Sequence, residues 1–229
     1  MNNPYYMQEK TCTTMNALKV PFLAHLNKDS GLDDIANVLD GLEAHPVAIA
    51  PWPEFSGGAD VSFKIAHSGD CLFLKYIVTE PEIRIVYQQS NDPVYKDSCV
   101  EFFILMGVEK EYYNFEFNAI GTCLAAFGED RNSRTFLPAA TIAQIQSTTL
   151  LQTEHSDGQQ MVSWTLTLKM PLAIFIHHPV GNLKNLQCRG NFYKCGDNLT
   201  RPHYLAWNAI TAPQPDFHLS AFFGSIHFE

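Results

Sequence analysis

The chain has 229 residues, of which 46% are hydrophobic and 17% are charged, so it is long enough and apolar enough to fold around a sizeable core. Its formal net charge of −9 gives an acidic surface, which repels phosphate backbones and anionic lipid headgroups and excludes nucleic acid and membrane surfaces as preferred partners. No apolar run in the sequence reaches the roughly 18 residues that a membrane span requires.

The first fifty residues are expected to form a lead-in that packs on the main fold. Residues 1–14 contain neither a basic nor an apolar segment of the kind found in signal peptides. The expected location is therefore cytoplasmic for the sequence as written, and periplasmic or secreted if the natural protein carries a leader. Residues 30–46 contain Ile35, Val38, Leu39 and Leu42 at helical spacing, and the segment ends at Pro46, which predicts a short helix.

From residue 59 the hydrophobic pattern changes to a period of two, which predicts strands. The pattern predicts a hairpin over residues 59–80 that turns at 67–70, and it predicts that residues 98–106 pair with 111–121. Further strands are predicted at 82–89, 122–130, 161–171, 186–196, 203–210 and 222–229. Short strands joined by Gly, Asn, Asp and Pro turns predict an all-β, antiparallel β-sandwich of the jelly-roll or immunoglobulin-like kind, with residues 1–229 as one domain.

Strand alternation explains how Glu101 fits into the apolar stretch "SCVEFFILM". In a strand, Phe102 points to one face and Glu101 to the other. The same rule places Asn114 and Glu116 on one face of the next strand, and Arg189 on the polar face of residues 188–195. If these strands are neighbours, their polar side chains share one surface of a sheet, and Arg189 is a possible structural partner for Glu101.

Motifs for several kinds of chemistry are absent from the sequence. The nine histidines show no zinc-ligand spacing, and there is no nucleophile elbow or phosphate-binding loop. The six cysteines form no CxxC pair and are predicted to be buried free thiols. Acidic turns at 128–132 and 195–198 leave structural calcium open, without assignable ligands. Met106 and His203 leave a haem site open as a minor alternative.

Two further hypotheses about function involve sugars. Glu101 and Glu116 could act as the acid and base of a glycoside hydrolase, which requires roughly 5–9.5 Å between the carboxyl groups. Alternatively, sugar rings stack on flat aromatic side chains while fixed polar groups bind their hydroxyls. Candidates for such aromatic walls are Tyr95, Trp207 and Trp52.

Several motifs resemble carbohydrate-binding module family 9 and the related DOMON-like sandwich domains. They run in the family's order over nearly the whole chain, and the last three together are hard to obtain by chance. The motifs are "LFLKYIVTE", "PVYKDSCVEFFI", "YYNFEFNAIGT", "SWTLTLKMPL", "RGNFYKCG", "YLAWNAI" and "PDFHLSAFFGSIHF". The resemblance implies a non-catalytic sugar-binding sandwich, accessory to polysaccharide or glycan breakdown and without a cofactor other than structural calcium.

In that family, two aromatic rings hold a terminal sugar above a polar floor. By motif, Tyr95 matches the first ring, where the best-known binders have Trp, and Trp207 matches the second. Glu101 matches the floor carboxylate, and Asn114 and Glu116 match a pair that is Arg and Asn in known binders. The expected partner is a mono- or oligosaccharide, or the end of a sugar chain. The predicted ligand-binding residues are therefore Tyr95, Glu101, Asn114, Glu116, Trp207 and Arg189. A sandwich that has lost its ligand and acts as an interaction module remains a further alternative.

Overall fold

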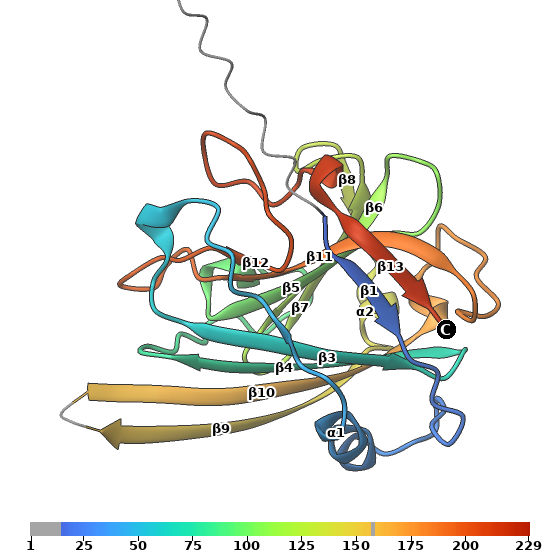
Figure 1. Cartoon of the computed structure of the whole chain (residues 1–229), viewed down its shortest axis with the longest axis horizontal. Helices are drawn as coiled ribbons and strands as arrows, with labels where there is room; N and C mark the ends of the chain where they lie inside the picture. The colour runs from blue at the N-terminus through green and yellow to red at the C-terminus, as the bar shows by residue number, and fades with distance from the viewer. Residues whose placement is uncertain (1–14, 157–158) are drawn as a thin grey trace, which may run out of the picture.

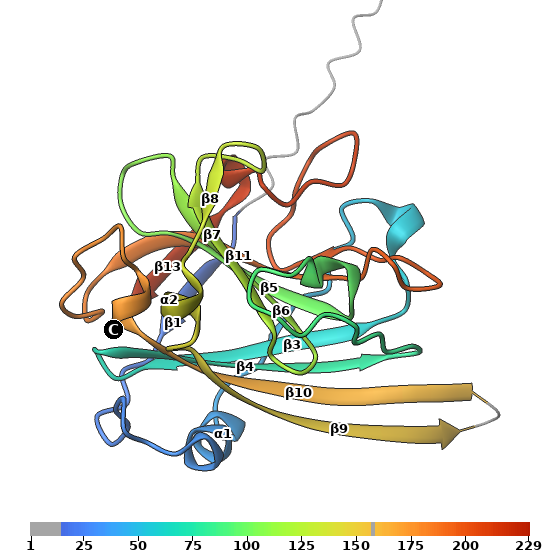
Figure 2. The ribbon, with the colours of Figure 1, turned by 180° about the vertical axis from the view of Figure 1, so that it is seen from behind.

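The computed structural model describes residues 15–156 and 159–229, and these residues form two β-sheets that pack face to face (Figures 1 and 2). The larger sheet has eight strands, seven of them in one edge-to-edge path. In spatial order that path is β1 (Ala17–Val20), β13 (Gly224–Phe228), β11 (Gln187–Cys195), β5 (Cys99–Leu105), β6 (Tyr112–Asn118), β7 (Cys123–Gly128) and β8 (Arg134–Phe136), with β12 (Leu205–Ala206) beside β11. All pairs are antiparallel except β1 with β13, so the predicted antiparallel sandwich is confirmed with one parallel edge pair.

The smaller sheet has five strands and carries the helix on its outer side (Figure 2). In spatial order its strands are β2 (His45–Pro46), β3 (Asp60–His67), β4 (Cys71–Glu80), β10 (Gln159–Pro171) and β9 (Gln146–Ser156). The predicted lead-in helix is confirmed as α1 (Leu32–Asp40), which buries Ile35 and Leu39 against Phe73 of β4. A second, shorter helix, α2, spans Ala139–Ile142.

The main core lies between the two sheets and is rich in aromatic rings. Phe63 of β3 stacks on Phe192 of β11 with ring centroids 3.6 Å apart, and Phe192 also stacks on Phe102 of β5 at 4.8 Å. Trp207 completes this group, with its ring edge-on to Phe63 and Phe192. The alternation predicted for residues 99–105 is therefore correct, since Phe102 faces the core between the sheets.

The opposite face of β5, β6 and β11 is also largely buried, which the sequence analysis did not predict. Phe103, Tyr112 and Tyr193 on that face pack under the segment that returns from β12 to β13, and Phe217 of this segment stacks on Tyr193 at 4.1 Å. The polar groups predicted to share this face therefore lie within a second hydrophobic cluster, and only part of the face opens to solvent.

Two of the predicted strands need correction, and four observed strands were not predicted. Residues 82–89 form no strand, because amides of this segment bond to side chains: Val86 and Tyr87 donate to Asp97 Oδ2. The strand expected at 203–210 shrinks to the two residues of β12, and β1, β2, β8 and β9 were not predicted. The β9 sequence "QSTTLLQTEHS" has no regular alternation, which is why its pairing with β10 was not visible.

Two further expectations concern single residue types and membrane spans. Five of the six cysteines lie in the described residues, and all five are buried and free, as predicted; Cys12 lies outside the described residues. Within residues 15–156 and 159–229, no helix has the length and apolar character needed to cross a bilayer.

Candidate functional site

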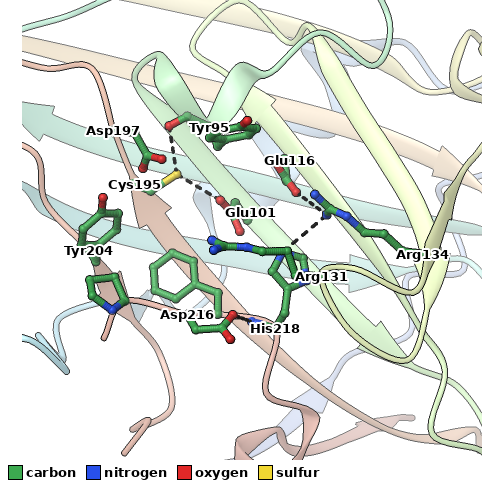
Figure 3. A pocket seen from close by; sticks show the side chains of 12 residues that line it. Tyr95, Glu101, Glu116, Arg131, Arg134, Cys195, Asp197, Tyr204, Asp216 and His218 are labelled. Carbon is green, nitrogen blue, oxygen red and sulfur yellow. Dashed lines mark hydrogen bonds and ion pairs between the residues drawn. The ribbon is translucent and has the colours of Figure 1, made fainter. Parts of the chain in front are cut away.

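The candidate site is a cavity of about 320 Å³ over the outer face of β5, β6 and β11, which we call the Glu101 pocket (Figure 3). Its volume is at the lower end of the ~300–1,000 Å³ that ligand pockets usually have. The floor comes from the strands, and the sides come from the loops around η2 (Val94–Lys96), before β8 and between β12 and β13. Its lining residues are Tyr95, Glu101, Glu116, Arg131, Arg134, Cys195, Asp197, Tyr204, Pro215, Asp216, Phe217 and His218.

Two carboxylates form the floor because β5 and β6 are neighbours in register. Glu101 lies directly opposite Glu116, and the two side chains are only 3% and 2% exposed. Arg134 Nη1 donates to Glu116 Oε1 at 3.0 Å, and Asn114 Nδ2 donates to the same oxygen at 2.9 Å. Among the described residues, Glu116 Oε2 is buried without a hydrogen-bond partner, so the floor holds an acceptor that a ligand could satisfy.

Burial changes the acidity of both floor carboxyl groups. It raises the pKa of Glu101 well above its ordinary value, and the neighbouring Glu116 charge adds to this effect. Burial also raises the pKa of Glu116, but the Arg134 guanidinium acts in the opposite direction. The partner of Glu101 is a thiol, since Cys195 Sγ donates to Glu101 Oε1 at 3.0 Å. The two carboxyl groups are therefore unequal: Arg134 stabilises the charge of Glu116, and no comparable cation pairs with Glu101 among the described residues.

Aromatic side chains form part of the pocket's rim. Tyr95 is half-buried on η2, where Val94 is fully buried and anchors the loop. The loop is also held by Asp97, whose Oδ2 accepts hydrogen bonds from two backbone amides and from Asn118 Nδ2. On another side, Tyr204 lies edge-on to Phe217 with ring centroids 5.9 Å apart. Figure 3 shows Tyr95 and Tyr204 on different sides of Cys195.

The remaining charges come from the loops. Arg131 is exposed and reaches toward Glu101 (Figure 3), while Asp197 and Asp216 are half-buried. Burial together with Arg134 and Arg131 lowers the pKa of His218 to about 2, so this imidazole is neutral at physiological pH. Arg134 can only donate, so its 3.4 Å contact makes Nε2 of His218 the acceptor and places the ring proton on Nδ1, 2.9 Å from the Tyr112 hydroxyl.

The pocket includes three of the six predicted binding residues: Tyr95, Glu101 and Glu116. Asn114 lies behind the floor and positions Glu116. Trp207 is not at the pocket; it is 6% exposed and belongs to the core between the sheets. Trp52, the other aromatic candidate, packs beneath the rim, and its Nε1 donates to the Ala212 carbonyl.

Arg189 also lies elsewhere, so it is not the partner of Glu101. Its guanidinium donates to the carbonyls of Ser220, Ala221 and Phe223 and so caps the end of the η4 turn (Ser220–Phe222). The strand order β11-β5-β6 is as predicted, but Arg189 lies opposite Leu105, four residues along β5 from Glu101.

Nine pocket residues were not predicted: Arg131, Arg134, Cys195, Asp197, Tyr204, Pro215, Asp216, Phe217 and His218. Most lie on loops, where no periodicity marks the direction of a side chain. Asp197 belongs to one of the acidic turns weighed for calcium, and in the other turn Asp130 accepts hydrogen bonds from the amides of Asn132 and Ser133. Met106 and His203 lie apart, the former in the core and the latter in a separate cavity.

Comparisons with known proteins point to one family. The family model described as carbohydrate-binding family 9 matches residues 33–228. A Bacteroides uniformis protein described as a candidate carbohydrate-binding protein has a crystal structure that is similar with a TM-score of 0.86 and 33% identity, over 94% of this chain and 100% of that chain. No curated protein sequence matches.

Two more distant structures also match. Both are family 9 carbohydrate-binding modules from Caldicellulosiruptor kristjanssonii. The one in complex with glucose has 11% identity and a TM-score of 0.47, over 93% of this chain and 96% of that chain. The one in complex with cellotriose has 13% identity and a TM-score of 0.48, over 93% of this chain and 94% of that chain.

Proposed function

The chain belongs to carbohydrate-binding family 9, and we propose that its Glu101 pocket binds a sugar without catalysing a reaction on it. The observation that carries the proposal is the floor of the pocket. Glu116 Oε2 is a buried acceptor that no described residue satisfies, and it belongs to a cavity with an aromatic rim. A buried acceptor of this kind costs about 1–3 kcal/mol when it is unpaired, and a sugar hydroxyl would remove that cost.

Each part of a sugar has a counterpart in the pocket. The apolar CH face of a pyranose ring would pack on Tyr95, with Tyr204 and Phe217 on another side of the cavity. The ring hydroxyls would donate to Glu101 and Glu116 and accept from Arg134. The small cavity suits one or two sugar units or the end of a chain, in a module accessory to polysaccharide or glycan breakdown.

Binding is favoured over hydrolysis by the position of the two carboxylates. Glycoside hydrolases place an acid and a second carboxylate on either side of the scissile bond. Here Glu101 and Glu116 rise from adjacent strands of one sheet and would approach a sugar from the same side. Glu116 is also held by Arg134 and Asn114, which suits a fixed acceptor.

The proposal is tested with a glycan array followed by calorimetric titration of the best ligand. Replacing Tyr95 by Ala removes one stacking wall, which is worth about 1.4 kcal/mol or a tenfold loss of affinity. Phe22→Ala is the matched control, because Phe22 is 38% exposed and lies outside the pocket. Equal affinity of wild type and Tyr95→Ala, or no binding to any glycan by the wild type, would reject this site.

The hydrolase alternative is tested separately with chromogenic glycosides. The expected result is no release of the chromophore by the wild-type protein. Turnover that Glu101→Gln abolishes while sugar binding persists would instead identify an enzyme and overturn the non-catalytic proposal.

A further inference from the structure

Two cysteines and one glutamate meet at the floor of the Glu101 pocket. Cys99 on β5 lies opposite Cys195 on β11, and both point to the same face of the sheet as Glu101. One ligand atom from each residue, the two Sγ atoms and a carboxylate oxygen, lie within 4.8 Å of one another. All three residues are buried in adjacent central strands, which hold them more rigidly than loops would.

This arrangement matches the ligand preferences of zinc. Zinc bound by Cys and Glu has Zn–S distances of about 2.3 Å and Zn–O distances of about 2.0–2.2 Å, which places tetrahedral ligands roughly 3.3–3.8 Å apart. Cys195 Sγ and Glu101 Oε1 are already 3.0 Å apart. Small rotations of the side chains would bring all three atoms around one ion. Calcium and magnesium prefer oxygen ligands only, so the two sulfurs select a softer ion.

The pocket would leave one side of such an ion accessible. Cys195 and Glu101 line the cavity directly, whereas Cys99 lies deeper. Three protein ligands with a fourth position open to a cavity are typical of zinc sites that bind water or an external ligand. A sugar hydroxyl or a water molecule could take that position.

The electrostatics are compatible with a site that is stable in the absence of metal. Burial raises the pKa of the Cys99 thiol to about 12 and raises the pKa of Cys195 well above its ordinary value, so both thiols are protonated in the metal-free protein. Zinc binding would release these protons, because the metal ligand is the thiolate. Arg134 and Arg131 at the pocket would offset part of the negative charge of the ligand set.

We propose that Cys99, Glu101 and Cys195 form a binding site for a single zinc ion at the floor of the pocket, with its fourth position open to the cavity. The proposal does not depend on sugar binding, since its ligands and its readout are those of a metal. It does imply that zinc and sugar share Glu101, so metal loading should change sugar affinity.

The test is a titration of the reduced protein with Co²⁺, a coloured substitute for zinc, in the absence of sugar. The expected result is one equivalent bound, with tetrahedral visible bands and sulfur-to-cobalt charge-transfer absorption, displaced by Zn²⁺. Cys99→Ala and Cys195→Ala should each lose these signals. Cys188→Ala is the matched control, because Cys188 lies on the same strand as Cys195 but faces the core between the sheets, and it should keep them.

A near-isosteric variant guards against failure of the cysteine variants to fold. Glu101→Gln keeps the shape of the side chain and should fold, but it should bind Co²⁺ at least tenfold more weakly. Zn²⁺ should raise the melting temperature of the wild type and of Cys188→Ala more than that of Glu101→Gln. Absence of charge-transfer absorption in the wild type, or equal Co²⁺ affinity of wild type and Glu101→Gln, would overturn the proposal.

Discussion

Replacing Arg134 by Met should lower the free energy of unfolding by about 3 kcal/mol at neutral pH. The guanidinium lies 3.0 Å from Glu116 Oε1, and Glu116 is only 2% exposed, so the substitution leaves a buried carboxylate without its cation. Breaking a buried ion pair from one side costs about 3–5 kcal/mol. The hydrogen bond from Asn114 remains, which places this pair at the lower end of that range.

The loss of unfolding free energy in Arg134→Met should increase as the pH rises. Burial raises the pKa of Glu116, and this variant lacks the Arg134 guanidinium, which is the main group that counters that effect. A carboxyl whose pKa is higher in the folded state binds a proton more readily there, so stability is lost as the pH rises above the pKa of the unfolded chain. The loss should grow between about pH 5 and pH 8 by up to about 1.4 kcal/mol per pH unit.

Urea unfolding followed by tryptophan fluorescence measures this deficit. The double variant Glu116→Gln/Arg134→Met removes both charges and should recover most of the lost stability. Its remaining deficit relative to the wild type should not grow as the pH rises. Arg131→Met is the matched control: Arg131 is exposed and forms no ion pair among the described residues, so its effect should stay within about 0.5 kcal/mol. Equal destabilisation by the two arginine variants, or a deficit that shrinks as the pH rises, would refute the reasoning.

Three further predictions concern residues around the site. Burial lowers the pKa of His203 to about 4, so the unfolded chain takes up a proton at a higher pH than the folded protein does. Acidification from about pH 7 to pH 5 should therefore lower the free energy of unfolding by about 2 kcal/mol. His203→Gln should abolish this loss in urea unfolding. Asp97→Asn should lower the free energy of unfolding by about 2 kcal/mol. Hydrogen exchange at the Val86 and Tyr87 amides should accelerate, because both amides donate to the Asp97 carboxylate. Trp207→Ala should lower the free energy of unfolding measured in urea by about 3–5 kcal/mol. It should leave the sugar affinity of the folded fraction unchanged, because Trp207 is a core residue and does not line the pocket.

The sequence predicted the β-sandwich and the direction of the floor side chains because both follow from local alternation. The hairpin of β3 and β4 and the pair β5–β6 have a clear period of two, and their register follows from short turns. Glu101 and Glu116 were therefore placed correctly on one face. The same reasoning failed for residues 82–89, where tertiary hydrogen bonds to Asp97 replace the strand that the local pattern predicts.

The rim of the pocket could not be predicted, because its geometry depends on how long loops fold back over the sheet. Trp207 and Tyr204 are three residues apart on one short segment, yet Trp207 packs between the sheets and Tyr204 lines the cavity. The cross-strand bridge of β12 to β11 fixes this difference, and it spans only two residues. Arg134 was missed for a similar reason, since its contact with Glu116 spans 18 residues of sequence and arises only when β8 pairs with β7.

The floor of the pocket also shows why Glu101 is better explained by a ligand than by stability. Its face of β5 is otherwise apolar, with Phe103 and Tyr193 packed nearby in the second hydrophobic cluster. A carboxyl group placed there loses its hydration, and its one hydrogen-bond donor among the described side chains is the weak thiol of Cys195. An apolar residue of similar volume would be tolerated at least as well by such surroundings. Residues that bind a ligand are often unfavourable for stability. Glu101→Leu should therefore raise the free energy of unfolding and lose affinity for both sugar and zinc.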